Sequence, residues 1–169
     1  MYDVVCVGTT AVDMYFKGPA LHEKEGHFQL VIGGKYFTDF FYEGVGGGAT
    51  NVAIGLAKQN IRSVLYSEIG QNSFKRFIFE KLEAHAIPVR HCVLSHDYHN
   101  ISTVLLTTDG DRTVINHRTH RSTFVHTLPE QSLFTGAQML YMGNLAYVSE
   151  WHRARLLRHA KHLNLTTVI

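Results

Sequence analysis

Two patterns of apolar and polar residues alternate along this chain. Short apolar runs typical of buried parallel strands occupy residues 4–7, 63–69, 138–142 and 165–169. Apolar positions at helical spacing predict helices that begin near residue 48 and span 74–82 and 151–163. For the helix over 74–82, Asn72 or Ser73 is the expected cap. The alternation of strands and helices indicates an α/β fold.

Two stretches interrupt this alternation. Within residues 12–43, apolar and polar side chains alternate, which predicts half-exposed antiparallel structure. The same stretch is rich in aromatic residues, namely Tyr36, Phe37, Phe40, Phe41 and Tyr42. Further on, residues 101–108 and 113–116 flank Asp109-Gly110-Asp111, which is typical of a β-hairpin.

The segment Gly44-Val45-Gly46-Gly47-Gly48-Ala49-Thr50-Asn51 leads directly into the first predicted helix. Glycine costs about 1 kcal/mol relative to alanine inside a helix, so a cluster is tolerated where the backbone turns sharply or approaches another group closely. Free backbone N–H groups at a helix N-terminus point toward whatever binds there. We therefore expect a ligand site at this segment.

The composition is that of an ordinary globular chain of 169 residues, with 45% hydrophobic and 18% charged residues. We expect one domain over residues 1–169. A net charge of +2 is too small for a nucleic-acid footprint, and no apolar run approaches the ~18 residues of a membrane span. Cys6 and Cys92 lie far apart in apolar runs and are expected as buried thiols. With no leader pattern at the start, the expected location is the cytoplasm.

The last predicted strand, over residues 165–169, has no helix after it to cover the sheet. We expect the chain to stop part-way through a larger fold, because exposed strand edges are an aggregation liability. The alternative is a small natural domain with a protected edge strand.

Several ordered motifs resemble the ribokinase-like carbohydrate kinases of the phosphofructokinase B type, over essentially the whole chain. They are Gly8-Thr9-Thr10-Ala11-Val12-Asp13, Gly46 to Ala53, Glu68-Ile69-Gly70-Gln71-Asn72-Ser73-Phe74, Ser102-Thr103, Asp109 to Thr113 and His117-Arg118. The resemblance implies the N-terminal half of a three-layer αβα core with a small antiparallel β lid, formed by residues 13–43 and 100–118. It also implies ATP-dependent phosphorylation of a sugar or related alcohol, with Mg²⁺.

By this resemblance, Asp13 binds hydroxyls of the acceptor, Gly47 and Gly48 form the sugar-facing turn and lid hinge, and Asn51 bonds a further hydroxyl. A carboxylate suits vicinal hydroxyls, because it accepts two charge-assisted hydrogen bonds at once. The alternatives are a turn or cap role for Asp13 and a local backbone contact for Asn51.

Other positions depart from the ribokinase pattern, so a ribose specialist is not expected. Ala11 and Gly48 stand where ribokinase has asparagine and lysine, and Asn144 or Leu145 stands where it has a sugar-binding glutamate. Arg118 resembles a lid arginine of some sugar and sugar-acid kinases, or else belongs to a solvated strand edge.

The family's Gly-Ala-Gly-Asp signature, which supplies the anion hole and the catalytic base, does not occur in residues 1–169. We therefore expect no catalytic base and no metal ligand in this chain, which supplies the acceptor side only. On this view the chain alone is catalytically incompetent and the longer protein is the kinase. The alternative is a catalytically inactive sugar-binding or nucleotide-binding fragment. The resemblance also implies a homodimer through the lid, where the exposed aromatic residues would meet.

Two rival classes rest on weaker patterns. The residues Gly44, Gly46 and Ala49, followed by Glu68, formally fit a dinucleotide-binding fingerprint, although not at the first strand where it belongs. Histidine pairs at 96 and 99 and at 159 and 162 hint at metal binding, but tetrahedral zinc needs three or four ligands, so scattered surface histidines are the expected interpretation.

Overall fold

A computed structural model describes residues 1–120, 129, 131–145 and 148–169. Its core is a four-stranded parallel sheet in the order β12-β11-β1-β6. The strands are β1 (Val4–Val7), β6 (Ser63–Tyr66), β11 (Met139–Met142) and β12 (Thr166–Val168). Each lies within one of the predicted runs. β1 and β6 are buried throughout and β11 at alternate residues, as parallel strands with both faces covered require, whereas every residue of β12 is exposed.

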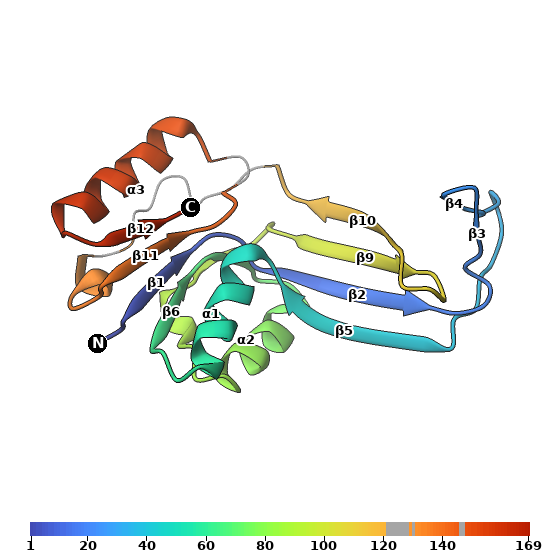
Figure 1. Ribbon diagram of the computed structural model, residues 1–169, viewed down its shortest axis with the longest axis horizontal. Helices are drawn as coiled ribbons and strands as arrows, with labels where there is room; N and C mark the ends of the chain where they lie inside the picture. The colour runs from blue at the N-terminus through green and yellow to red at the C-terminus, as the bar shows by residue number, and fades with distance from the viewer. Residues whose placement is uncertain (121–128, 130, 146–147) are drawn as a thin grey trace.

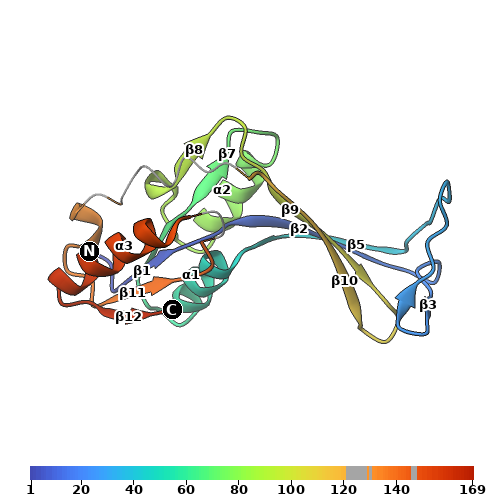
Figure 2. The same cartoon turned by 90° about the horizontal axis from the view of Figure 1, so that it is seen from above.

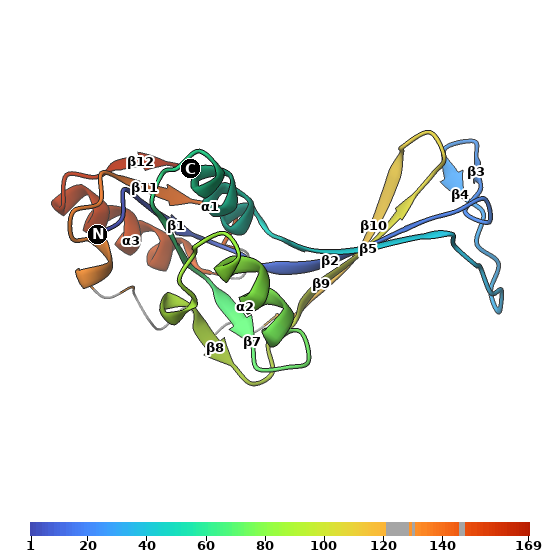
Figure 3. The same ribbon diagram turned by 90° about the horizontal axis from the view of Figure 1, so that it is seen from below.

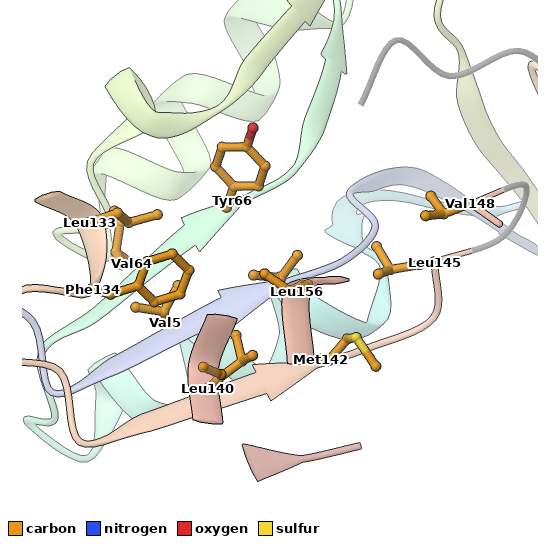
Figure 4. Packing of buried hydrophobic residues seen from close by; sticks show 12 residues of the cluster. Val5, Val64, Tyr66, Leu133, Phe134, Leu140, Met142, Leu145, Val148 and Leu156 are labelled. Carbon is orange, nitrogen blue, oxygen red and sulfur yellow. The ribbon is translucent and has the colours of Figure 1, made fainter. Parts of the chain in front are cut away.

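Helices cover both faces of this sheet (Figure 1). Helices α1 (Gly48–Lys58) and α2 (Lys75–Glu83) lie on one face and α3 (Glu150–His162) on the other. Consecutive residues of β1 point to opposite faces: Val4 and Cys6 pack with the first two helices, while Val5 and Val7 pack with α3. Figure 4 shows the α3 side of this core. The predicted three-layer αβα arrangement is confirmed.

A second four-stranded sheet extends away from the core (Figures 2 and 3). Its strands are β2 (Ala11–Lys17), β5 (Phe40–Gly46), β9 (Asn100–Leu106) and β10 (Arg112–Arg118), in the order β10-β9-β2-β5. The expected pairing around residues 109–111 is present, since β9 and β10 are antiparallel. Near the far end lie two short strands, β3 (Glu23–Lys24) and β4 (His27–Phe28).

Two local predictions were wrong. The run 63–69 is not one strand, because it breaks at Ser67 and continues as β7 (Glu68–Gly70), which pairs with β8 (Val93–Ser95) in a separate sheet. Helix α2 has Phe74 as its N-cap residue rather than Asn72 or Ser73. Asn72 instead accepts a hydrogen bond from the Phe74 amide and donates one to the Tyr98 carbonyl oxygen.

Two short 3-10 helices are also present, η1 (Val89–His91) and η3 (Gln131–Phe134).

Both cysteines are free thiols, with Cys6 buried and Cys92 half-buried. Of the helices in the described part of the chain, none combines the length and apolar composition that crossing a bilayer requires.

Candidate substrate site

The candidate site lies where the carboxyl ends of the core strands meet the base of the second sheet. Ligands of open α/β sheets bind at this edge. Thr9 and Thr10 follow β1, Ser67 follows β6, and Gly143 and Asn144 follow β11. The Gly143 amide donates to the Val7 carbonyl oxygen at 2.8 Å, which ties two of these strand ends together.

Asp13 lies half-buried in β2, opposite Gly44 of β5 and Ser102 of β9. Its carboxylate occupies the space above Gly46, where a Cβ atom would overlap it. Any other residue at position 46 would displace this carboxylate. The absence of a side chain there is therefore a structural requirement of the site rather than a general need for flexibility.

Helix α1 begins beside this carboxylate. Its N-cap residue Gly47 has φ +97°, a conformation that L side chains rarely adopt, and a Cβ atom there would overlap the Thr9 carbonyl oxygen. Gly48 is exposed, and the position of its missing Cβ lies 4.0 Å from the Asn144 amide nitrogen. Asn51 has an exposed side chain in the first turn, and its backbone N–H donates to the Gly47 carbonyl oxygen.

The structure therefore brings Asp13, Gly47, Gly48, Asn51 and Asn144 to one edge. The sequence alone left open whether Asn144 or Leu145 is the candidate site residue after β11. Leu145 is buried in the core on the α3 side, whereas Asn144 is exposed.

Arg118 lies at the core end of β10, two strands across the sheet from β2. It is half-buried, and its Nε atom donates to the Asn100 side-chain oxygen at 3.2 Å. Neighbouring strands of a sheet lie about 4.8 Å apart. Arg118 is therefore two strand spacings from β2, at the far side of the sheet base.

Sequence reasoning missed a polar row beside Asp13. Ser102 of β9 lies next to Asp13, and Asn116 of β10 lies next to Ser102, to whose hydroxyl it donates at 3.1 Å. The same face forms a hollow lined by Asp13, Tyr15, Ser102, Val104, Arg112 and Val114. Strand alternation was the available signal, because residues 100, 102 and 104 share one face.

A family comparison decides the affiliation. The model described as "pfkB family carbohydrate kinase" matches residues 39–167, which is most of the chain. The chain belongs to the pfkB family. No curated protein sequence matches it.

Solved structures share the fold of this pfkB-family chain. A ribokinase of Arabidopsis thaliana complexed with ribose and ATP is 14% identical, with a TM-score of 0.79. A PfkB protein from Polaromonas sp. JS666 is 19% identical with a TM-score of 0.75, and a Cryptococcus neoformans ribokinase in complex with ADP is 17% identical with a TM-score of 0.70. Each match covers 99% of the chain but only 53%, 54% and 48% of these structures, in that order. The chain spans about half their length.

Burial and charge shift several ionisable groups of the pfkB-family chain. The pKa of Tyr15 is raised, first by burial and second by the charge of Asp13 on the same strand face. Burial raises the pKa of Tyr98 to about 12, and it does the same for the thiols of Cys6 and Cys92. These thiols are therefore protonated at neutral pH and unsuited to nucleophilic chemistry.

The geometry does not favour the rival interpretations. For the dinucleotide-binding fingerprint, Gly44 and Gly46 lie within β5 rather than in a strand-to-helix turn, and Glu68 is buried and accepts a hydrogen bond from Ser95.

For the metal site, no group of three His, Cys, Asp or Glu side chains within the described ranges could hold a metal ion. His162 is exposed as expected, but His159 is half-buried with its ring 5.2 Å from that of Phe134, so it is not a surface histidine.

Proposed function

We propose that this chain forms the acceptor-binding side of an ATP-dependent carbohydrate kinase. The observation that carries the proposal is the Asp13 carboxylate, seated over Gly46 beside the N-terminus of α1. Membership of the pfkB family supports the reaction class, a phosphoryl transfer to a sugar or related alcohol.

Each site residue has a proposed role. Asp13 accepts hydrogen bonds from two neighbouring hydroxyls, which are stronger than bonds to a neutral acceptor. Gly47 and Gly48 present backbone without side chains, so the acceptor can approach the helix N-terminus closely. Asn51 and Asn144 lie exposed around that approach and bond further hydroxyls. Arg118 places a positive charge at the far side of the sheet base.

Asp13 is not the catalytic base in this proposal, because it holds hydroxyls that do not react. Phosphoryl transfer depends on positioning and on stabilising developing charge, with a carboxylate to accept the hydroxyl proton. We propose that this base, the anion hole and most of the nucleotide site lie in residues outside this chain. Support comes from the missing Gly-Ala-Gly-Asp sequence and from the half-length match to the ribokinase structures.

ATP would supply the transferred phosphoryl group, with Mg²⁺ to neutralise its charge. The described residues do not fit the metal, since no three of their carboxylate, imidazole or thiol groups gather at one point. Their contribution is confined to binding and orienting the acceptor.

We also propose that the second sheet acts as a lid over the acceptor, with residues 13–43 and 100–118 as its segments and the turn at Gly47 as a hinge. Its outer strand carries exposed aromatic side chains, among them Phe40, Phe41 and Tyr42, and Phe37 lies just before it. Exposed apolar patches of this kind mark partner surfaces. The proposed partner is the lid of a second copy.

An assay for phosphoryl transfer tests the division of labour. The purified 169-residue chain, incubated with ATP, Mg²⁺ and a panel of aldoses, ketoses and nucleosides, is expected to form no ADP. Acceptor-dependent ADP formation that disappears in Asp13→Asn would show that the chain is a complete kinase and overturn this division. ADP formation retained in Asp13→Asn would point to a contaminating kinase, and the assay would be repeated after further purification.

A further inference from the structure

The four strands of the second sheet meet the core in one buried network of side chains. Thr10, just before β2, lies at the centre of this network. Its hydroxyl oxygen is 2.8 Å from the hydroxyl oxygen of Thr50, which lies in the first turn of α1, the helix that follows β5. The Thr10 hydroxyl donates to the Ser67 hydroxyl at 2.9 Å, at the break after β6. All three side chains are at most 2% exposed, so water cannot replace these bonds.

Asn100, the first residue of β9, joins the other two strands to this network. Its side-chain nitrogen donates to the Thr10 carbonyl oxygen at 2.8 Å. Its side-chain oxygen accepts from Arg118 Nε, at the end of β10. Asn100 is 6% exposed, so a lost bond would leave a buried carbonyl group unsatisfied.

From this arrangement we infer that Asn100 is a positioning residue, which fixes the angle between the second sheet and the core and holds Arg118 at the sheet base. One amide satisfies both neighbours, because it offers a donor and an acceptor on opposite atoms. The inference goes beyond the proposed function, since it concerns the junction itself and needs no bound acceptor.

Substitutions at position 100 separate the two bonds. Asn100→Ala removes both. Asn100→Asp has nearly the same shape and keeps the acceptor for Arg118, but its ionised carboxylate cannot donate to the Thr10 carbonyl oxygen. Lowering the pH protonates the introduced carboxyl, whose ordinary pKa is about 4, and restores a donor.

Distances between two spin labels report the angle. Labels at Lys58→Cys, near the end of α1, and at Asp109→Cys, in the β9–β10 turn, attach to exposed positions on the two sides of the junction. The background carries Cys92→Ala, and Cys6 is fully buried. Thr113→Ala, on an exposed position of β10, is the matched control, and circular dichroism checks the fold of each variant.

We expect one narrow distance distribution for the parent protein and for Thr113→Ala at pH 7.5. Asn100→Ala and Asn100→Asp are expected to broaden it at least twofold, and Asn100→Asp is expected to narrow again at pH 3, relative to the parent at that pH. If Asn100→Ala fails to fold, the pH series of Asn100→Asp decides alone. A parental width for Asn100→Asp at pH 7.5, or a width that does not respond to pH, would overturn the inference.

Discussion

At the scale of single residues, Asp13 influences its neighbour Tyr15 as well as the proposed acceptor. Both side chains line the same hollow, and the Asp13 charge contributes to the raised pKa of Tyr15. Asp13→Asn removes that charge while keeping the shape, so the pKa of Tyr15 should fall. An NMR titration of ¹³C-labelled tyrosine rings measures the change. Asp109→Asn, in the distant turn, is the control, and an unchanged or higher Tyr15 pKa in Asp13→Asn would contradict the placement.

A second residue pair makes stability depend on pH. Arg62 donates two side-chain bonds and one backbone bond to Asp3, and these hydrogen bonds lower the pKa of Asp3 below its ordinary value of 3.8. A lowered folded-state pKa contributes stability above the ordinary value, and this contribution is lost as the pH falls through the lowered one. Asp3→Asn should therefore destabilise the protein at pH 7 but hardly at pH 2.

Urea unfolding at the two pH values measures this difference. Glu83→Gln, on an exposed position of α2, is the matched control and should show little effect at either pH. An equal loss of stability in Asp3→Asn at both pH values would mean that the ion pair does not carry the effect.

At the scale of elements, the N-cap residue Gly47 and the helical residue Gly55 of α1 have opposite requirements. A Cβ atom at Gly55, in the exposed middle of the helix, meets nothing within 4 Å. Gly55→Ala should therefore raise the free energy of unfolding by about 1 kcal/mol. Gly47→Ala should lower it by at least about 1 kcal/mol, because of the positive φ and the overlap with Thr9.

Thermal and urea unfolding of the two variants provide the comparison, with each glycine serving as the control for the other. Equal effects of both substitutions would contradict the close packing of α1 against the residues that follow β1.

The elements also show how far sequence reasoning reaches. The β-branched residues of 165–169 located the edge strand β12, although it is exposed along its length. Apolar runs located β1, β6 and β11, because burial is a local property of each run. They could not reveal the break at Ser67, since β6 and β7 are equally buried and only their partner strands differ. Partner choice depends on residues far away in sequence, here β1 and β8.

The candidate site was predictable to a similar extent. The glycine segment and Asp13 stood out by composition and by resemblance, whereas Asn100 and Asn116 did not, and Ser102 stood out only as part of a family motif with no expected place in the site. These three residues gain their surroundings only when β9 and β10 pair beside β2, an arrangement that no local pattern specifies. The Leu145 alternative could be set aside only once its burial was known.

At the scale of the whole molecule, the exposed aromatic side chains of the second sheet predict self-association. Phe41 is 53% exposed and lies against Phe16, with ring centroids 5.2 Å apart. Sedimentation velocity is expected to show a dimer that Phe41→Ser weakens, while Trp151→Ser, an exposed aromatic substitution on α3, leaves it intact. A monomer at all concentrations would contradict the proposed lid contact.

The central claim is that the edge around Asp13 binds a polyhydroxy acceptor, and amide NMR shifts of the ¹⁵N-labelled chain test it most directly. The chain would be titrated with a panel of aldoses, ketoses and nucleosides. We predict that at least one of them shifts the amides of Asp13, residues 46–51 and Asn144, and that Asp13→Asn abolishes these shifts while leaving the rest of the spectrum unchanged. A folded chain whose amides respond to none of the compounds, or respond only away from this edge, would contradict the account.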